Sequence, residues 1–303
     1  MTRIARLRRC CLSVPGDSDK MLDKSQTMDC DQLILDLEDS VAYESKAKAR
    51  DKVSKAIKEK SFFAKTVSVR INATDTEHCH SDLIELVSRA GEKLDTVILS
   101  KTRRPADVLF VDMLLSQLEN KHGLTKKIGI ECLIEDVEGL MRVEEIASST
   151  DRTEALIFGM GDFAASQGMR IQTIGGGGNN QANDIWHYPR YKITIAAKAF
   201  GLDAIDGPYA DFTDTEHLKS DCDRASLIGM NGKWAIHPTQ IKVIQTIFSY
   251  SEEEVKNAKA QLAAYEEGKK NGLGVVKLGN TMIDAASVKL VETVLEKAKL
   301  MDL

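Results

Sequence analysis

Short apolar runs alternate with longer amphipathic stretches along most of this chain. The apolar runs are rich in Val, Ile and Leu, which is typical of buried strands. The stretches between them repeat apolar residues at the spacing of a helix face. We expect strands at Cys10–Val14, Gln32–Asp36, Thr66–Ile71, Thr96–Ser100, Ile128–Ile134, Ala155–Phe158, Ala204–Ile205 and Trp234–Ile236. We expect helices between them, among others at Ser45–Glu59, Thr76–Ala90, Ala106–Leu118 and Tyr188–Phe200.

Eight strand–helix units in roughly 245 residues are the number that a (β/α)8 barrel needs. We therefore predict an α/β fold with a TIM barrel over residues 1–250. A doubly wound open sheet gives a similar alternation and stays as the alternative. The least distinct strands are the sixth and the seventh, at Ala155–Phe158 and Ala204–Ile205.

The pattern changes after His237. Ile241–Tyr250 is expected to be the last barrel helix, and a charged amphipathic helix is expected at Glu252–Lys270. A Gly-rich stretch follows, and a final helix runs from Asp284 to Lys299. Because no further strand–helix unit occurs, we expect residues 251–303 to form a C-terminal helical extension. It would either pack as a cap or reach a neighbouring subunit.

Composition narrows the class of protein. Hydrophobic residues make up 43% and charged residues 29%, as in ordinary globular proteins. The 41 Lys and Arg against 46 Asp and Glu give a net charge of −5, which argues against a nucleic-acid binder. No apolar run reaches the roughly 18 residues of a membrane span. The chain contains six cysteines without a C-x-x-C pair, which indicates buried, reduced thiols in a cytoplasmic protein.

The N-terminus is basic, with Arg3, Arg6, Arg8 and Arg9, and resembles a transit peptide. It leads directly into the first expected strand and leaves almost nothing to cleave. We therefore expect a cytoplasmic location.

Charged side chains follow several of the expected strands directly. In a TIM barrel the carboxyl ends of the strands surround the active site, so these side chains should converge there. In chain order they are Asp36, Glu38, Asp39, Arg70, Lys101, Glu135, Asp136, Asp162 and His237. The sequence therefore predicts a cavity with several carboxylates and at least one arginine.

Glu135 and Asp162 are the candidate metal ligands. Two carboxylates after adjacent strands suit Mg²⁺, which prefers oxygen ligands and keeps several waters. The alternative is that each acid caps the helix that follows it. Spacing alone does not decide between these interpretations.

Arg70 and Lys101 are the basic candidates. Arg70 would hold a carboxylate or stabilise an oxyanion, or it would form a structural ion pair with Asp36 or Glu38. Lys101 ends a strand, as Schiff-base lysines do, but we favour an electrostatic role or none.

Three further motifs resemble functional sites. Gly159–Ala164 matches G-x-G-x-x-A, but about 150 residues precede it, whereas a dinucleotide fingerprint opens the first βα unit. The triplet His78–His80 falls at the start of a polar helix, which favours a surface position over a metal site. Gly175–Gly178 lacks the G-K-[ST] of a P-loop and is expected to form a lid.

The motifs together resemble a known family. The matching segments are Val14–Gly16, Leu35–Val41, Val69–Asn72, Ile134–Leu140, Phe158–Phe163, Ala204–Tyr209, Gly232–Ile241 and Met282–Asp284. The chain resembles the citrate lyase β-subunit-like CoA-ester lyases of the aldolase/citrate lyase superfamily, and most of all malyl-CoA and citramalyl-CoA lyases. The resemblance extends from about residue 10 to residue 300.

The resemblance implies a Mg²⁺-dependent TIM barrel that assembles as a homo-oligomer, a trimer or a hexamer. It implies that Glu135 and Asp162 hold Mg²⁺ and that Arg70 stabilises an enolate. It further implies that Asp284 comes from the tail of a neighbouring subunit and acts as the catalytic acid or base. Asp36 and Asp39 are then expected to orient Arg70 and the waters of the metal.

Coenzyme A, as part of the substrate, is expected to lie against Pro15, Gly16, Lys20, Pro208 and Tyr209. The chain departs from the family here, because Asp17-Ser18-Asp19-Lys20 replaces the usual Ser-Arg-Pro followed by Arg. Lys20 would contact phosphate as a point charge and not as a fork. This departure leaves open whether CoA or an acyl carrier brings the substrate.

The implied reaction is the reversible cleavage of a β-hydroxyacyl-CoA into a 2-oxo acid and an acyl-CoA. Malyl-CoA, β-methylmalyl-CoA and citramalyl-CoA are the expected substrates, and glyoxylate or pyruvate the expected acid. The alternatives are a citrate lyase β subunit that acts on citryl-acyl carrier protein and a malyl-CoA thioesterase. A non-catalytic partner subunit and a 2-keto-3-deoxy acid aldolase remain further alternatives.

Overall fold

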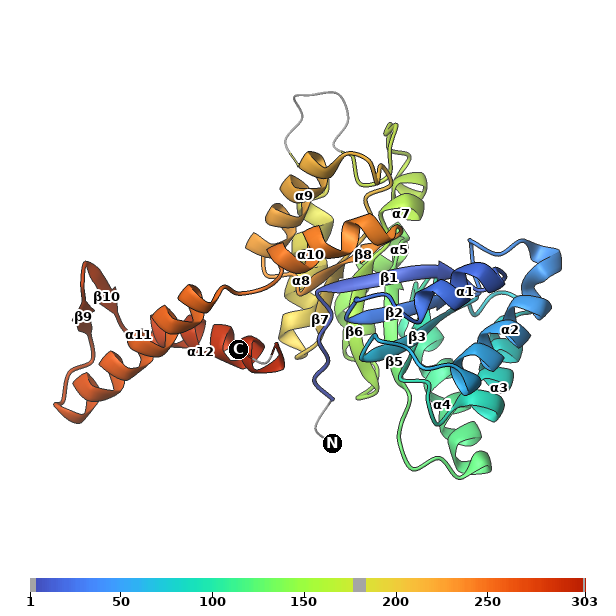
Figure 1. The fold of residues 1–303 in the computed structure, drawn as a ribbon, viewed down its shortest axis with the longest axis horizontal. Helices are drawn as coiled ribbons and strands as arrows, with labels where there is room; N and C mark the ends of the chain where they lie inside the picture. The colour runs from blue at the N-terminus through green and yellow to red at the C-terminus, as the bar shows by residue number, and fades with distance from the viewer. Residues whose placement is uncertain (1–3, 177–183, 302) are drawn as a thin grey trace.

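Eight parallel strands close into a barrel in chain order (Figure 1). The structure is a computed structural model that describes residues 4–176, 184–301 and 303. The strands are β1 (Cys10–Pro15), β2 (Gln32–Asp36), β3 (Thr66–Ile71), β4 (Thr96–Leu99), β5 (Gly129–Ile134), β6 (Thr153–Phe158), β7 (Asp203–Asp206) and β8 (Gly232–Ala235). The predicted TIM barrel is confirmed. The open-sheet alternative is wrong, because β1 pairs with β8 and closes the sheet.

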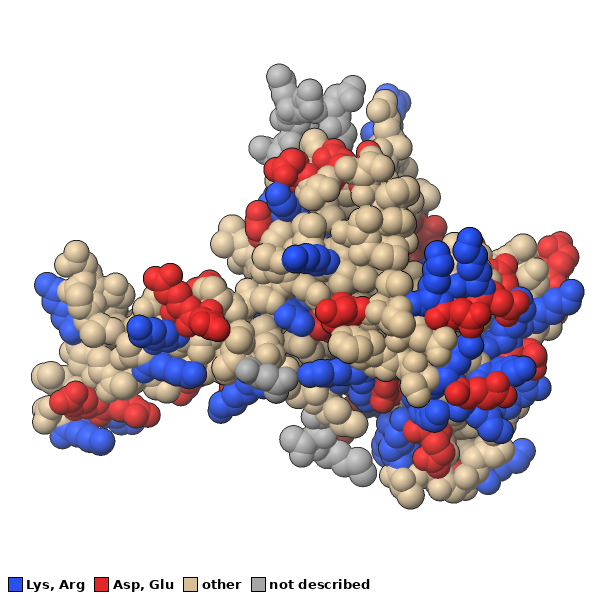
Figure 2. Space-filling model, in the orientation of Figure 1, with Lys and Arg blue, Asp and Glu red and all other residues tan. Residues whose placement is uncertain are grey.

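Helices surround this barrel and connect its strands (Figure 1). They are α1 (Asp19–Ser25), α2 (Lys46–Glu59), α3 (Cys79–Ala90), α4 (Pro105–His122), α5 (Val137–Met141), α6 (Val143–Ala147), α7 (Met160–Gln167), α8 (His187–Ala199), α9 (Thr215–Leu227) and α10 (Ile241–Ile247), with short 3-10 turns at Tyr43–Ser45 and Pro238–Gln240. Basic and acidic side chains are interspersed over α1 to α4 on the face that Figure 2 shows.

The barrel interior is filled in layers. In β2, Ile34 packs inward against residues such as Ile98 and Trp234, while Leu33 and Leu35 pack outward against the helices. The strands are thus buried on both faces, which explains their continuous apolar runs. The predicted bounds of β2 and β3 agree with the structure. β7 is one residue longer at each end than the predicted Ala204–Ile205.

A polar network occupies the amino-terminal end of the barrel. The buried Glu131 carboxylate accepts hydrogen bonds from the Gln32 amide at 2.9 Å and from the Thr96 hydroxyl at 2.8 Å. The Arg8 guanidinium lies 3.2 Å from the same carboxylate and also pairs with Glu154. These polar groups satisfy one another and lie below the apolar layer, so they fill this end of the barrel.

The chain continues beyond the barrel as an extension that projects to one side (Figure 1). It consists of α11 (Glu252–Lys270), the antiparallel hairpin β9 (Val276–Leu278) and β10 (Thr281–Ile283), and α12 (Ala285–Leu300). The sequence predicted both helices but not the hairpin, which turns at Gly279 with a φ of 59°. Strands of three residues carry too little periodicity to detect.

The extension exposes apolar side chains that its own helices do not cover. Met282 is 64% exposed and Leu290 is 73% exposed. Large apolar side chains in such a projecting segment are typical of a surface that contacts another chain.

The six cysteines are all free and buried, as the sequence predicted. Among the described residues, every helix is too short or too polar to cross a membrane.

Candidate active site

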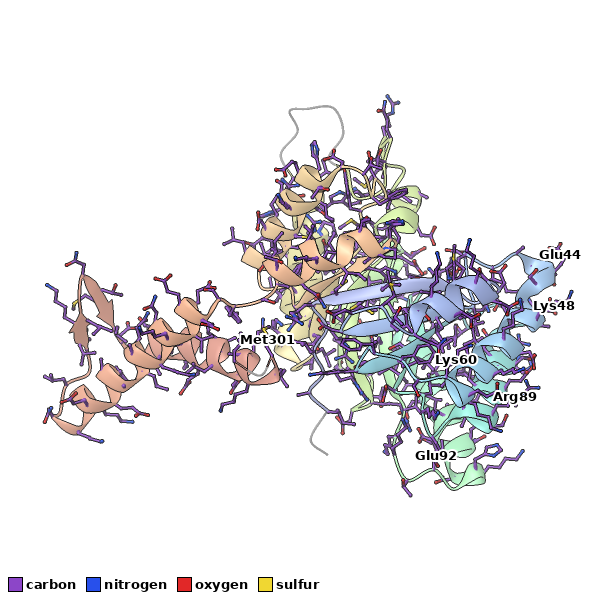
Figure 3. The ribbon with its side chains drawn as sticks, in the orientation of Figure 1. Glu44, Lys48, Lys60, Arg89, Glu92 and Met301 are labelled. Atoms are coloured by element: carbon purple, nitrogen blue, oxygen red, sulfur yellow. The ribbon has the colours of Figure 1, made fainter. Side chains whose placement is uncertain are left out.

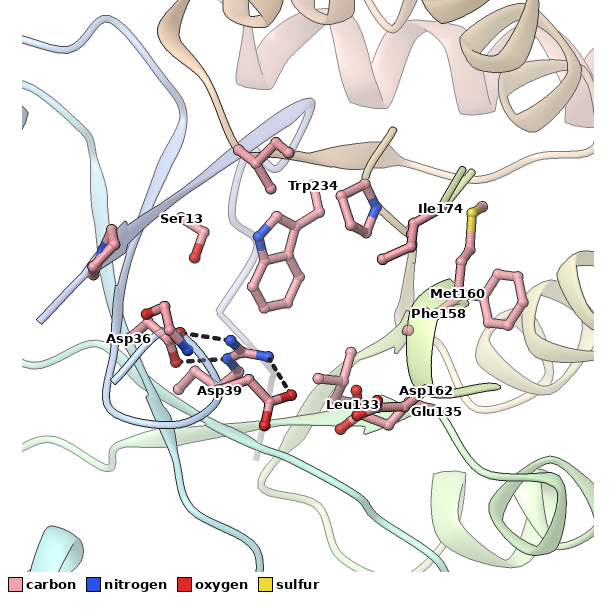
Figure 4. Close-up of a pocket in the computed structure, with 17 residues that line it drawn as sticks. Ser13, Asp36, Asp39, Leu133, Glu135, Phe158, Met160, Asp162, Ile174 and Trp234 are labelled. Carbon is pink, nitrogen blue, oxygen red and sulfur yellow. Dashed lines mark hydrogen bonds and ion pairs between the residues drawn. The ribbon is translucent and has the colours of Figure 1, made fainter. Parts of the chain in front are cut away.

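A cavity of about 330 Å³ opens at the carboxyl ends of the strands (Figure 4). Its walls come from residues of six strands and from the segments that follow them. The charged residues that line it are Asp36, Asp39, Arg70, Glu135 and Asp162. The convergence predicted from the strand ends is therefore present.

Arg70 is fixed in the cavity by Asp36 (Figure 4). The Arg70 Nε lies 2.6 Å from Asp36 Oδ1, and Nη2 lies 2.5 Å from Oδ2, which is a bidentate geometry. Asp36 is completely buried and also accepts the backbone N–H groups of Glu38 and Ser40. Burial opposes its charge, but the Arg70 hydrogen bond and charge outweigh it and lower the pKa of Asp36. Arg70 thus keeps one orientation, with its guanidinium 5.5 Å from the centre of the Trp234 ring.

Glu38 is a second partner of Arg70, and sequence reasoning had given it only a structural role. Its Oε2 lies 3.0 Å from Arg70 Nη1, and its Oε1 contacts the Lys101 ammonium. Asp39 lies farther out, 4.0 Å from Arg70 and 3.3 Å from Lys101, and its side chain is 55% exposed. The residue that bridges the two cations is therefore Glu38, while Asp39 lies at the rim.

Glu135 follows β5 and is buried against Gly159. A Cβ atom at position 159 would lie 2.4 Å from Glu135 Cβ, so the glycine makes room for this side chain. Glu135 Oε1 accepts the backbone N–H of Lys101 at 2.7 Å. Burial, followed by the charge of Glu38, raises the pKa of Glu135 to about 8. The carboxylate thus lies in a region with too little positive charge to stabilise its ionised form.

Asp162 lies in the first turn of α7, not at the strand end itself. Its Oδ2 atom is buried without a hydrogen-bond partner and lies 3.4 Å from the Lys101 Nζ. The residues that cap α5 and α7 are Asp136 and Gly159, so neither Glu135 nor Asp162 is an N-cap. The capping interpretation therefore does not apply to the two candidate ligands.

The residues present fit a hard divalent cation. Glu135 and Asp162 offer oxygen donors, one buried donor atom has no hydrogen-bond partner, and the local charge is negative. Among the described residues, no group of three or more His, Cys, Asp or Glu side chains is arranged to hold a metal. A site of two carboxylates suits Mg²⁺, which completes its shell with water and substrate.

Lys101 is unsuited to Schiff-base chemistry. Burial opposes its charged form, but the hydrogen bond to Glu38 and the charges of Glu38, Glu135 and Asp39 outweigh it and raise its pKa. A nucleophilic lysine must lose its proton near neutral pH. The structure therefore favours the electrostatic role.

The residues expected to contact CoA are divided between two places. Pro15 and Pro208 line the cavity. Lys20 is exposed on α1 and lines a neighbouring cavity of about 370 Å³, which also contains Pro15 and Lys24.

Gly16 and Tyr209 are buried and do not line the catalytic cavity directly. The Gly16 N–H donates to the Asp36 carbonyl at 2.8 Å, and the buried Tyr209 directs its hydroxyl toward Asp214 at 3.4 Å. They shape the walls from behind.

Asp284 does not line the cavity of its own chain. It lies between β10 and α12, where its side chain is exposed and accepts the Ser287 N–H as the N-cap of α12. These backbone and side-chain hydrogen bonds with Ser287 lower the pKa of Asp284.

The remaining motifs have structural positions. Gly159–Ala164 forms the start of α7, and His78 precedes the first residue of α3, where Cys79 is buried. Of the expected lid, Gly175 and Gly176 are described, and residues 177–178 lie outside the described residues.

Sequence reasoning missed the roles of Glu38 and Lys101 in connecting Arg70 to Asp162. Both residues follow strands directly, so the rule that found the other acids also points to them. It does not reveal which side chains pair.

The chain matches the family model described as HpcH/HpaI aldolase/citrate lyase over residues 9–238. It is 37% identical over 305 residues to an L-malyl-CoA/beta-methylmalyl-CoA lyase from Cereibacter sphaeroides, with 98% of this chain and 96% of that protein covered. It is 29% identical over 291 residues to a (3S)-malyl-CoA thioesterase from the same strain, with 96% and 94% covered.

Among solved structures, the chain resembles the CitE protein of Mycobacterium tuberculosis in complex with magnesium, acetoacetate and coenzyme A. The TM-score is 0.75 at 28% identity, and the match covers 96% of this chain and 97% of that one.

Proposed function

The chain belongs to the HpcH/HpaI aldolase/citrate lyase family, and from this premise we propose that it cleaves the carbon–carbon bond of a small β-hydroxyacyl-CoA. The products are a 2-oxo acid and an acyl-CoA, and the preferred substrates are malyl-CoA, β-methylmalyl-CoA or citramalyl-CoA. The observation that carries the proposal is the placement of Arg70 and the Glu135–Asp162 pair in one cavity. The 37% identity to a malyl-CoA/beta-methylmalyl-CoA lyase supports this substrate class.

Glu135 and Asp162 are proposed to hold Mg²⁺. When bound there, the ion supplies Lewis-acid polarisation of the oxygen atoms of the acid fragment. The Oδ2 of Asp162, which has no hydrogen-bond partner, and the raised pKa of Glu135 support a cation at this place. Magnesium in the CitE structure of Mycobacterium tuberculosis supports the choice of ion.

Arg70 is proposed to stabilise the enolate oxygen of the acyl-CoA fragment. Cleavage moves negative charge onto the thioester oxygen, and a preorganised cation stabilises that charge most in the transition state. Asp36 and Glu38 hold the guanidinium in place before the substrate arrives, so little reorganisation is needed.

Asp284 is proposed to exchange the proton with the enolate carbon, in the site of a neighbouring subunit. In cleavage the protonated carboxyl donates to the acyl-CoA carbanion, and in condensation the carboxylate removes the same proton. The exposed position of Asp284 in a projecting extension with apolar side chains supports this arrangement. A homo-oligomer, a trimer or a hexamer, follows from the same proposal, with residues 251–303 as the exchanged extension.

Coenzyme A is proposed to extend from the catalytic cavity into the neighbouring one. The two cavities share Pro15, and the second one offers the ammonium groups of Lys20 and Lys24 to phosphate. The side chain of Asp39, which is proposed to order water near the metal, lies at the rim of the catalytic cavity.

A thioesterase that acts on malyl-CoA is the second candidate, because one relative has this activity in its name. The test incubates the full-length protein with malyl-CoA and citramalyl-CoA, with Mg²⁺ or with EDTA, and follows acetyl-CoA and free CoA separately. Acetyl-CoA release that EDTA abolishes supports the lyase. Free CoA without acetyl-CoA supports the thioesterase, and no reaction with either ester points to an acyl-carrier-bound substrate.

Asp284→Ala tests the proposed proton transfer. We expect turnover to be abolished while Mg²⁺ binding, measured by calorimetry, stays near that of the wild type, because Asp284 is not a proposed ligand. Loss of Mg²⁺ binding in this variant would contradict the assignment.

A further inference from the structure

Lys101 has an unusual backbone conformation. Its φ of 48° makes it the one non-glycine residue with a positive φ among residues 4–176 and 184–301. A side chain in the left-handed region is disfavoured relative to glycine, and such outliers persist where surrounding interactions hold them. At this position the chain retains a lysine and does not use the glycine that the backbone would prefer.

Both ends of Lys101 are engaged in the candidate metal site. Its backbone N–H donates to Glu135 Oε1 at 2.7 Å. Its ammonium contacts Glu38, lies 3.3 Å from Asp39 Oδ1 and lies 3.4 Å from Asp162 Oδ2. The ammonium donates hydrogen bonds to Glu38 and Asp39, whereas its approach to Asp162 is an ion pair without a hydrogen bond. One residue therefore contacts both proposed metal ligands, one through its backbone and one through its side chain.

Among the described residues, five carboxylates in this region surround two cationic side chains that form ion pairs with members of the group, Arg70 and Lys101. The acids are Asp36, Glu38, Asp39, Glu135 and Asp162. Lys46 lies nearby, but its ammonium donates to the backbone carbonyls of Leu37 and Glu38. Arg70 is committed to Asp36 and Glu38. Among the described residues, Lys101 is therefore the cation that forms an ion pair with Asp162 Oδ2, the oxygen without a hydrogen-bond partner.

We propose that Lys101 is a resident cation that competes with the divalent ion for Asp162 and so sets the affinity of the site for metal. The inference rests on the proposed metal site. In the metal-free protein the ammonium neutralises Asp162. When the ion occupies Asp162, Lys101 keeps its contacts with Glu38 and Asp39.

If Lys101 competes with the metal ion, removal of its charge must increase the affinity of the site for metal. Two positive charges a few ångströms apart near a protein surface repel strongly enough to change an affinity by about tenfold or more. If Lys101 merely supported the fold, its removal would leave the affinity for metal unchanged or weaken it. Tighter binding after removal of the charge therefore distinguishes competition from support.

The test measures Mn²⁺ binding to the metal-free, full-length protein by electron paramagnetic resonance, without any CoA ester. We expect Lys101→Met to bind Mn²⁺ about tenfold more tightly than the wild type, because the side chain keeps most of its length and loses its charge. Lys101→Arg should stay within about threefold of the wild type, since the charge remains. Lys60→Met is the matched control, because it removes a lysine from an exposed ion pair with Asp23 on the outer helices (Figure 3).

Lys101→Gly is the second variant. It removes the charge and relieves the positive φ, so it should fold even where the methionine variant does not. Tighter Mn²⁺ binding by either uncharged variant supports the proposal, and unchanged or weaker binding in both overturns it. No Mn²⁺ binding by the wild type would overturn the metal site and this inference together. Tighter binding in a protein without lyase activity would keep the inference and reject the proposed reaction.

Discussion

Two clusters of charged residues in this molecule differ in their balance of charge: one is fully buried, and the other opens to solvent at the cavity. One lies between β7, β8 and the helices α8 and α9, where Arg190 and Lys233 meet Asp206 and Asp221. The Arg190 guanidinium lies 2.9 Å from Asp206, and the Lys233 ammonium lies 2.7 Å from Asp221. All four residues are at most 1% exposed, and their charges cancel.

The other cluster lies at the cavity, where five carboxylates share Arg70 and Lys101. Both clusters combine Asp with Arg and Lys, so residue type alone does not separate them. The clusters differ in the negative charge that is left after the acids and the cations of each cluster are paired. A balanced cluster has no capacity for a further ion, whereas the acid-rich cluster leaves one carboxylate oxygen without a hydrogen-bond partner and raises the pKa of Glu135 to about 8. Uncompensated charge in a buried region is therefore the more specific mark of a binding site.

The largest effect is expected from breaking the balanced cluster. Lys233→Met removes the buried ammonium that pairs with both Asp206 and Asp221, and an uncompensated buried charge costs about 3–5 kcal/mol. Urea denaturation should show a loss of this size. Adding Asp206→Asn in the same chain restores neutrality and should recover part of the loss. A stability within 1 kcal/mol of the wild type for the single variant would show that the cluster is not structural.

The next effect concerns activity and not folding. Arg70→Lys keeps a positive charge but loses the bidentate fork with Asp36. We expect kcat to fall by about 10²–10³, as on removal of one preorganised oxyanion donor. The unfolding free energy should change little, and steady-state assays with saturating Mg²⁺ provide the measurement. An unchanged kcat would remove Arg70 from the proposed mechanism.

The two clusters should respond to pH with opposite slopes. Although burial opposes its charge, Lys233 and Arg190 lower the pKa of Asp221 to about 2 from 3.8, so its stabilising contribution is complete above about pH 4 and is lost as the pH falls through 2. This loss amounts to roughly 2 kcal/mol. Glu135 has a raised pKa, so in metal-free protein its contribution to stability declines as the pH rises from about 4.5 to 8. Equilibrium unfolding from about pH 2 to about pH 8, with and without Mg²⁺, gives both slopes.

The smallest effect is a gain. Glu135→Gln keeps this buried group neutral at every pH, so above about pH 8 the metal-free protein should become more stable by about 0.5–2 kcal/mol, while Mg²⁺ binding and turnover are lost. Thermal unfolding with EDTA measures the gain, and calorimetry measures the loss of binding. A destabilised variant that still binds Mg²⁺ would contradict the distinction between the two clusters.

The fold was predictable because its signal is repeated. Strands buried on both faces give continuous apolar runs such as Gln32–Asp36, and eight of them in order leave few alternatives. The convergence of Asp36, Arg70, Glu135 and Asp162 followed from the rule for strand ends. These predictions needed only which element precedes each residue.

The remaining features depend on side-chain pairing and on conformations without a period. The choice of Glu38 over Asp39 as the bridge to Arg70 depends on distances of 3.0 and 4.0 Å, which spacing does not encode. The positive φ of Lys101 has no sequence signal, since the residue is not glycine. Asp206 and Lys233 lie in segments that resemble the family. Their ion pair with each other, and the ion pair of Asp206 with Arg190, are visible only in three dimensions.

The polar network around Glu131 has a consequence for the order of kinetic events. It fills the barrel below the apolar layer, so the cavity communicates with solvent through its mouth. Two fragments formed in such a dead-end space cannot leave by separate routes. In the proposed reaction the fragment deeper in the barrel must wait for the outer one, so we expect acyl-CoA, whose CoA part is proposed to extend into the neighbouring cavity, to depart first and the 2-oxo acid second. Product-inhibition patterns of an ordered mechanism, with the acid competing for the empty site, are the kinetic signature of this closed floor.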